Sequence, residues 1–384
     1  MDYLQLATHY LVEDLKGKYI HLDTILPVID RLKSDFEITE IGKSVQNRSI
    51  YQIKIGTGKT KILMWSQMHG NESTTTKGVF DFFNFLLSDE KEASRIKKEY
   101  TLLCIPMLNP DGAYLYTREN ASNVDLNRDA FNATQPEMQV LHAIYKSFEP
   151  DYCYNLHDQR TIFGTEEFNL PATVSFLSPA FNSAREYNDV RLKSITIINK
   201  MNNVLQNYIP NQIGRFDDGY NINCTGDYFT TQMTPTILFE AGHYQNDYQR
   251  DQVRKYVFIA LLSSFDAINE NVIVDNELIK YLNIPQNNKC FYDFIYKNVK
   301  IIDNSEEKII NFAAQYTEVV QDGQLKYIAT IVKLDDLQDF KGHVEYDCAY
   351  GLFSSQGFNH PVLGEVANFY IDNLTEFNNG LKII

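Results

Sequence analysis

The sequence lacks long hydrophobic runs, has few cysteines and is short of positive charge. Its 384 residues include 5 cysteines, an odd and scattered set without a C-x-x-C spacing. This excludes a disulfide framework and argues against a cysteine-based zinc site. No run of 18 apolar residues occurs, and no basic N-terminal region precedes an apolar core, so we expect no membrane span and no signal peptide. We therefore expect a cytoplasmic protein, with secretion left open if a leader has been removed.

The charge balance excludes two classes of partner. There are 35 Lys and Arg against 50 Asp and Glu, a formal net charge of −15. General nucleic-acid binders and proteins that bind anionic membranes need a basic surface, so we expect neither partner. The hydrophobic fraction of 44% and the charged fraction of 22% are ordinary for a globular protein. A chain of this length is typical of two or three domains.

The first 270 residues alternate strand-like and helix-like runs, which predicts an α/β sheet covered by helices on both faces. After about residue 272 the sequence becomes aromatic and β-branched with turn-rich breaks, which predicts a smaller β-rich domain. We expect a catalytic domain over 1–272 and an accessory domain over 273–384. The expected strands are 61–67, 101–108, 152–156, 172–177 and 234–239, and later 290–301, 308–320, 326–333 and 360–371. The expected helices are 73–87, 136–148, 183–207 and 247–269.

Polar residues that can bind a metal follow the strand candidates. His69 and Glu72 stand three residues apart after one strand, and His157 ends another. Two imidazoles and a carboxylate, with an open position for water, are a known catalytic zinc set. Alone, H-x-x-E also fits a solvated loop, and His157 also fits a capping histidine.

A further carboxylate and an anion-binding stretch accompany this set. Glu240 ends the strand TPTILFE, where a carboxylate is costly without a partner or a task, and a general base is one such task. It also fits a strand-end cap, and its spacing to His243 leaves an E-x-x-H metal pair as a weaker alternative. Arg118, Asn127 and Arg128 can hold a carboxylate or stabilise an oxyanion.

Taken in order, these motifs resemble the zinc metallocarboxypeptidase family, the carboxypeptidase A-like peptidases, over residues 15 to 270. The family's H-x-x-E, N-P-D-G, Arg before D-x-N-R, later His and strand-end Glu all occur here in the family's order. The resemblance implies a mixed, mainly parallel sheet flanked by helices, and one Zn²⁺ per chain. It assigns zinc binding to His69, Glu72 and His157.

The resemblance also assigns the remaining roles. Glu240 is the general base, Arg118 stabilises the oxyanion, and Asn127 with Arg128 grips the substrate's terminal carboxylate. Asp125 resembles the outer carboxylate that orients the first zinc histidine.

This sequence departs from the family in three places. The gap of 85 residues between Glu72 and His157 is shorter than in the digestive members. The family's mobile substrate tyrosine has only a loosely aligned candidate, Tyr220, which also fits an ordinary loop aromatic. Asp227 either faces the specificity pocket, where it favours a basic terminal side chain, or caps a turn.

The resemblance thus implies hydrolysis of the C-terminal peptide bond of peptides through a zinc-activated water. The substrate is a peptide or small amide with a free carboxylate. One alternative is a zinc-dependent deacylase or amidase acting on N-acyl amino acids or cell-wall peptides. Another is a non-catalytic binding module, which the complete set of chemical groups makes the weakest interpretation.

Overall fold

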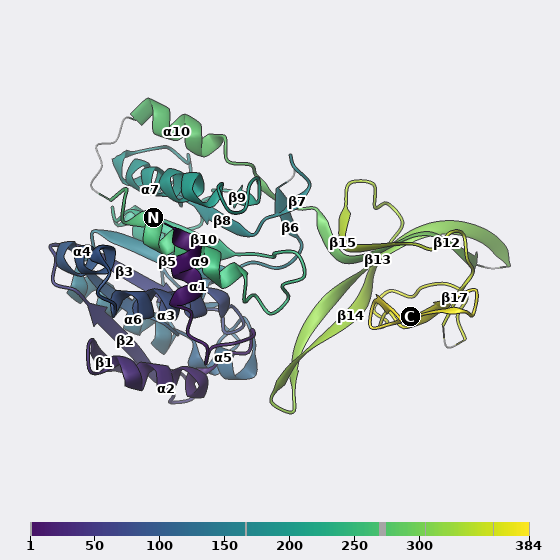
Figure 1. Cartoon of the computed structure of the whole chain (residues 1–384), viewed down its shortest axis with the longest axis horizontal. Helices are drawn as coiled ribbons and strands as arrows, with labels where there is room; N and C mark the ends of the chain where they lie inside the picture. Colours follow the sequence, from purple (N-terminus) through teal and green to yellow (C-terminus); the bar gives the residue numbers. More distant parts are fainter. Residues whose placement is uncertain (1, 166, 269–273, 304, 356, 384) are drawn as a thin grey trace. The chain divides into compact units, whose positions relative to one another are not determined.

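The chain forms two compact units in the computed structural model (Figure 1), which describes residues 2–165, 167–268, 274–303, 305–355 and 357–383. The first unit comprises residues 1–159 and 172–287, and the second comprises residues 160–171 and 288–384. The expected boundary between residues 272 and 273 lies outside the described residues. The twelve residues 160–171 group with the second unit although they are flanked on both sides by the first.

An eight-stranded sheet forms the centre of the first unit, in the order β1-β2-β4-β3-β5-β10-β8-β9. Neighbouring strands are parallel from β4 through β3 and β5 to β10, and β8 pairs parallel with β9. The pairs β1–β2, β2–β4 and β10–β8 are antiparallel. The expected mixed, mainly parallel sheet is confirmed. Its strands are β1 (Glu37–Lys43), β2 (Ser49–Ile55), β3 (Thr60–Ser66), β4 (Tyr100–Ile105), β5 (Tyr152–Asp158), β8 (Val174–Leu177), β9 (Ile213–Arg215) and β10 (Thr236–Ala241).

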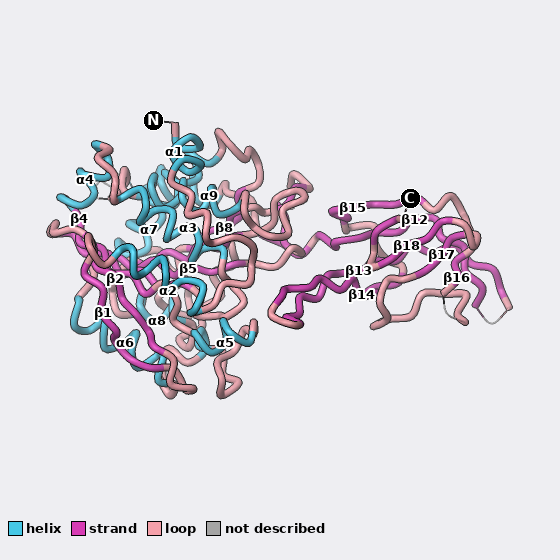
Figure 2. Tube along the Cα trace, turned by 60° about the horizontal axis from the view of Figure 1, so that its bottom comes forward, coloured by secondary structure: helices cyan, strands magenta, loops and turns pink. Residues whose placement is uncertain are grey.

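Helices cover both faces of this sheet, because its central strands are apolar on both sides (Figures 1 and 2). Along β3, Ile62 and Met64 pack with the core beneath α3, α7 and α9, whereas Leu63 and Trp65 pack with the core beneath α6 and α8. The helices are α1 (Tyr3–His9), α2 (Leu22–Leu32), α3 (Thr74–Leu86), α4 (Lys91–Glu99), α5 (Pro110–Leu115), α6 (Pro136–Phe148), α7 (Asp189–Leu205), α8 (Thr225–Thr231), α9 (Val253–Ser264) and α10 (Val274–Leu282), with the 3₁₀ turn η1 (Leu126–Arg128).

The second unit is β-rich, as predicted. One four-stranded sheet has the order β14-β13-β12-β15, a second has the order β16-β17-β18-β19, and β6 and β7 join β11 in a three-stranded sheet. Aromatic side chains fill its core: Tyr296 stacks on Phe312, and Phe369 meets Phe312 edge to face. The strands are β6 (Phe163–Thr165), β7 (Leu170–Pro171), β11 (Asn287–Lys289), β12 (Phe291–Asp303), β13 (Glu306–Gln321), β14 (Gln324–Leu334), β15 (Lys341–Asp347), β16 (Phe353–Ser354), β17 (Phe369–Ile371), β18 (Thr375–Asn378) and β19 (Leu381–Lys382).

Several expected elements are shorter than predicted, for local reasons. The helix expected over 183–207 begins only at Asp189, because Arg185 has φ +56° and the side chain of Asn188 caps the helix. The helix expected over 247–269 is confined to α9, and its last residue, 269, lies outside the described residues. The strand expected over 360–371 is reduced to β17, after a loop that contains Gly364 at φ +88°.

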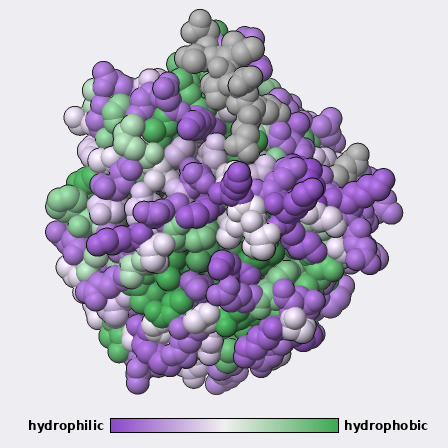
Figure 3. Space-filling view, turned by 90° about the vertical axis from the view of Figure 1, so that its left-hand side faces the viewer, coloured by the Kyte–Doolittle hydropathy of each residue, from purple (hydrophilic) through white to green (hydrophobic). Residues whose placement is uncertain are grey.

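The surface agrees with the sequence composition. On the face drawn in Figure 3, hydrophilic side chains cover most of the surface, and apolar side chains gather in its lower half. Among the described residues, no helix has both the length and the hydropathy needed to cross a membrane.

Candidate active site

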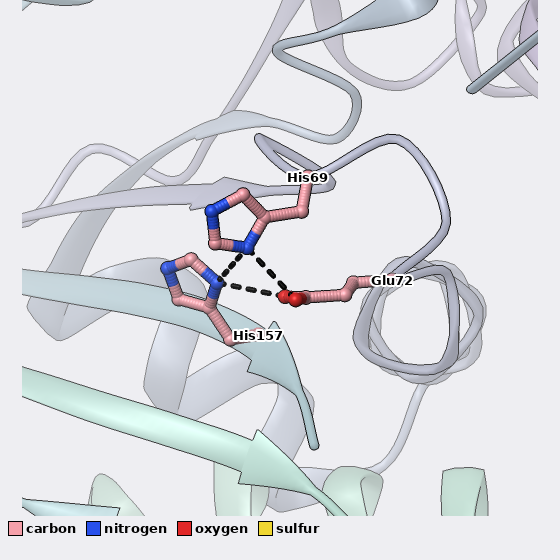
Figure 4. Close-up of side chains that lie close together, drawn as sticks. All are labelled: His69, Glu72 and His157. Carbon is pink, nitrogen blue, oxygen red and sulfur yellow. Dashed lines mark hydrogen bonds and ion pairs between the residues drawn. The ribbon is translucent and has the colours of Figure 1, made fainter. Parts of the chain in front are cut away.

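Three side chains that the sequence singled out converge at the carboxyl ends of two neighbouring parallel strands (Figure 4). His69 follows β3, His157 lies near the end of β5, and Glu72 stands just before α3. Nδ1 of His69 is 2.8 Å from Oε1 of Glu72, and Nδ1 of His157 is 2.8 Å from Oε2 of the same carboxylate. The two Nδ1 atoms are 3.1 Å apart. One atom from each residue can therefore reach a single ion.

The loop that carries His69 and Glu72 rests directly on the N-P-D-G segment. A Cβ atom on Gly70 would lie 1.9 Å from the carbonyl carbon of Gly112, so this close approach requires glycine. The Asn109 side chain joins the two loops: its Nδ2 donates to the Met68 carbonyl at 3.1 Å, and its Oδ1 accepts from the Gly112 N–H at 2.8 Å. The N-P-D-G segment thus packs against the loop that carries His69 and Glu72 and holds it in place.

Asp111 has a bracing role that sequence reasoning missed. Its fully buried carboxylate accepts hydrogen bonds from the Ser44 hydroxyl at 2.8 Å and the Gln46 N–H at 2.8 Å, and it pairs with Arg48 at 2.6 Å. Asp111 therefore ties the loop between β1 and β2 to the same segment. A single aspartate in a turn motif carries no signal for such a distant partner.

Two charged side chains, Asp125 and Arg118, contact the three converging residues. Asp125 Oδ1 is 2.9 Å from Nε2 of His69, and Asp125 Oδ2 accepts from Nε of Arg118 at 3.2 Å. Arg118 also reaches Oε1 of Glu72 at 3.1 Å, with 40% of its side chain exposed. The structure thus brings Asp125 to His69, as the resemblance implies, and Arg118 to the rim of the cluster.

The three side chains offer atoms that suit a metal cation such as zinc. When the Nε2–H of His69 donates to Asp125, its Nδ1 presents a lone pair toward Nδ1 of His157 and the Glu72 carboxylate. Burial alone would raise the pKa of Glu72, but positive charge on the imidazoles of His69 and His157 holds it well below its usual value, so a cation at this position stabilises the carboxylate. Three acceptors that face one another call for a shared positive charge, and two imidazole nitrogens with one carboxylate oxygen suit Zn²⁺.

Glu240 lies beside His157 across the β10–β5 ladder, where the two residues are registered partners. Its Oε2 is buried and has no hydrogen-bond partner among the described residues. Burial raises the pKa of Glu240 well above its usual value, and the carboxylates of Glu72 and Asp158 raise it further. This carboxylate therefore lies near the three converging residues with one oxygen that can accept a proton.

Asn127 and Arg128 lie on η1, directly after Asp125. Asn127 accepts the Thr225 N–H with its side-chain oxygen at 3.0 Å. Nη1 of Arg128 donates to the Asn127 carbonyl at 2.9 Å and contacts Sγ of Cys224 at 3.1 Å. Arg128 is exposed and forms no ion pair with a described carboxylate, so its guanidinium can receive an anion from solvent.

Two further candidates, Tyr220 and Asp227, bond to residues outside the group of His69, Glu72 and His157. The Tyr220 hydroxyl is 3.5 Å from that of Thr231, at the outer limit of a hydrogen bond. Asp227 is buried and accepts the Asn221 N–H at 2.9 Å, so its carboxylate holds the loop that carries Tyr220. Within the described residues, the one group of three or more potential ligand side chains is His69, Glu72 and His157, without His243.

Sequence reasoning also missed Asp158, which directly follows His157. Its N–H donates to Oε2 of Glu72 at 3.1 Å, and its carboxylate accepts from the backbone of α3. The available signal was an aspartate directly after His157, just beyond the apolar strand expected over 152–156, where an unpaired carboxylate is costly.

Residues 26–160 match the model of the zinc carboxypeptidase family. The resemblance to zinc carboxypeptidases is therefore confirmed. The matched segment contains His69, Glu72 and His157, whereas Glu240 and the second unit lie outside it.

The curated proteins that match part of this chain include carboxypeptidases. Carboxypeptidase 2 of Trichophyton rubrum is 26% identical over 126 residues, which covers 32% of this chain and 23% of the relative. Cytosolic carboxypeptidase 6 of Caenorhabditis elegans is 26% identical over 118 residues, which covers 30% of this chain and 24% of the relative. The chain thus matches about a quarter of the length of these relatives.

Solved structures share the zinc carboxypeptidase fold. Carboxypeptidase A from Helicoverpa armigera aligns with a TM-score of 0.52 at 17% identity, over 69% of this chain and 80% of its own. Thrombin-activatable fibrinolysis inhibitor aligns with a TM-score of 0.54 at 15% identity, over 71% of this chain and 81% of its own. At 15% and 17% identity, these structures show that the chain shares their fold.

Proposed function

We propose that the protein is a zinc-dependent metallocarboxypeptidase that hydrolyses the C-terminal peptide bond of peptides. The observation that carries this proposal is the convergence of His69, Glu72 and His157 at one edge of the sheet, with Glu240 on the neighbouring strand. The proposal rests also on the family match of residues 26–160.

His69, Glu72 and His157 would hold one zinc ion, and Asp125 would keep Nδ1 of His69 free by accepting from its Nε2. When bound, zinc supplies a Lewis acid that polarises the scissile carbonyl and makes water more acidic. Because the ligand atoms already lie close together, the protein reorganises little to bind the ion.

Glu240 would serve as general base and then general acid. Its buried Oε2, without a hydrogen-bond partner in the part of the chain that the structure describes, can accept a proton from the attacking water. The raised affinity of this carboxylate for a proton, caused by burial and by the nearby carboxylates, favours taking that proton, which Glu240 would then pass to the leaving amine.

Arg118 would stabilise the negative charge that develops on the carbonyl oxygen. Its guanidinium bonds to Glu72 and Asp125, and 40% of the side chain is exposed to solvent. A positive charge held beside the metal ligands is suited to an oxyanion that forms there.

Asn127 and Arg128 would bind the terminal carboxylate, which makes the enzyme specific for chain ends. Arg128→Ala should raise KM about 10- to 100-fold for substrates with a free terminus, because one charge-assisted hydrogen-bonding group is lost. It should have little effect on substrates whose terminus is amidated. Initial-rate kinetics on a matched free and amidated peptide pair measure both effects.

The matched control for this prediction is Arg31→Ala, which removes an exposed arginine on α2 that pairs with Asp14. That variant should leave KM unchanged on both substrates. Equal losses on the free and amidated peptides in Arg128→Ala would remove the carboxylate-binding role from Arg128.

A further inference from the structure

Asp158 connects the two segments that supply the three proposed metal ligands. It directly follows His157 at the end of β5, and its own N–H donates to Oε2 of Glu72 at 3.1 Å. Its side chain is buried, with 8% of the residue exposed. One residue therefore contacts one proposed ligand through its backbone and is covalently joined to another.

The Asp158 carboxylate binds the first turn of α3. Oδ2 accepts from the Thr74 N–H at 2.8 Å, and Oδ1 accepts from the Thr75 N–H at 3.1 Å. These donors have no partner within the helix, because the first N–H groups of any helix lack one. Asp158 thus acts as a cap that comes from another element.

The local capping residue does not provide this interaction. Ser73 precedes α3 but makes no side-chain capping bond, and its hydroxyl donates to the Lys18 carbonyl at 2.6 Å instead. The start of α3 is therefore fixed to the end of β5 by Asp158. Glu72 is separated from this helix by Ser73 alone, so the position of the helix start determines where the Glu72 carboxylate lies.

We propose that Asp158 is a positioning residue that holds Glu72 against His157 in the geometry that zinc requires. It neither touches the substrate nor binds the ion; it acts by fixing the first turn of α3 and by the N–H that orients Oε2 of Glu72. This inference rests on the proposed function for the identity of the metal. Loss of the Asp158 carboxylate frees the helix start, and the ligand atoms then no longer hold their spacing.

The test compares zinc affinity in Asp158→Ala with that in a matched capping variant. Asp247 is a buried aspartate whose carboxylate caps α9 by accepting from the N–H groups of Gln252 and Val253. Both alanine variants should lower the melting temperature of the zinc-free protein by a similar amount, because each loses a helix cap. Asp158→Ala alone should weaken zinc binding, by about 10- to 100-fold in a chelator competition assay.

A conservative variant separates geometry from charge. Asp158→Asn retains a side-chain oxygen for one helix N–H and should recover most of the affinity lost in Asp158→Ala. Equal zinc affinity in the Asp158→Ala and Asp247→Ala variants would overturn the positioning role. Wild-type protein that binds zinc tightly but releases no amino acid would contradict the proposed function. The zinc affinities of Asp158→Ala and Asp247→Ala would then still decide the role of Asp158. Wild-type protein that binds no zinc would overturn both.

Discussion

Glu240→Gln should reduce kcat about 10²- to 10⁴-fold while zinc remains bound. The amide cannot accept a proton from water, whereas His69, Glu72 and His157 keep all their ligand atoms. The substitution also removes a buried carboxylate whose negative charge is opposed by burial, by Glu72 and by Asp158. We therefore expect the zinc-free variant to be at least as stable as the wild type. Steady-state kinetics, zinc content and thermal unfolding measure the three effects.

The matched control for this result is Glu137→Gln. Glu137 is also buried, but its carboxylate accepts from the Val45 N–H and the Asn120 side chain rather than facing the site. That variant should keep its kcat. If Glu240→Gln retained near-wild-type turnover, a group other than Glu240 would be the base.

Arg254→Met should cost about 3–5 kcal/mol in the free energy of unfolding, a large share of the about 5–15 kcal/mol typical of folded proteins. Arg254 on α9 and Asp81 on α3 are both fully buried, with Nη2 and Oδ1 2.5 Å apart and Nε and Oδ2 2.7 Å apart. Arg254 also donates to the carbonyls of Val12 and Leu15. The variant leaves the Asp81 charge buried with the Val12 N–H as its remaining partner. Urea denaturation measures the loss.

Two further variants test the cause of this destabilisation. Arg31→Met removes an ion pair of similar length, in which Nη2 of Arg31 lies 2.6 Å from Oδ2 of Asp14. Both side chains of this pair are more than half exposed, so its loss should cost at most about 1 kcal/mol. Combining Arg254→Met with Asp81→Asn removes the unpaired charge and should recover part of the stability. A double variant less stable than Arg254→Met alone would show that the unpaired Asp81 charge is not the source of the loss.

The convergence of the three candidate ligands could be predicted from the sequence because it follows from strand order. His69 and His157 each come at the end of an apolar run, and parallel strands end at the same edge of a sheet. The ordered motifs then added Glu72 and Glu240. The structure places β3, β5 and β10 side by side, which brings these four residues to one edge.

The contacts that hold the candidate ligands in place could not be predicted, because each joins residues that are distant in the sequence. The bond from Asp158 to the start of α3 spans more than eighty positions, and the contact between Gly70 and Gly112 spans more than forty. The grouping of residues 160–171 with the second unit was equally hidden, because β6 pairs with β7, and β11 joins their sheet from more than a hundred positions further along the chain. Short-range periodicity carries no information on such pairings.

The most direct test of the central claim is the zinc content of the wild type and of His69→Ala, measured together with release of amino acids from a mixed peptide pool. We predict about one zinc per chain in the wild type, its loss in the folded variant, and release of amino acids from C-termini by the wild type alone. Zinc binding without release from peptides, combined with cleavage of N-acyl amino acids, would indicate a deacylase instead. Wild-type protein that binds no zinc would contradict the account.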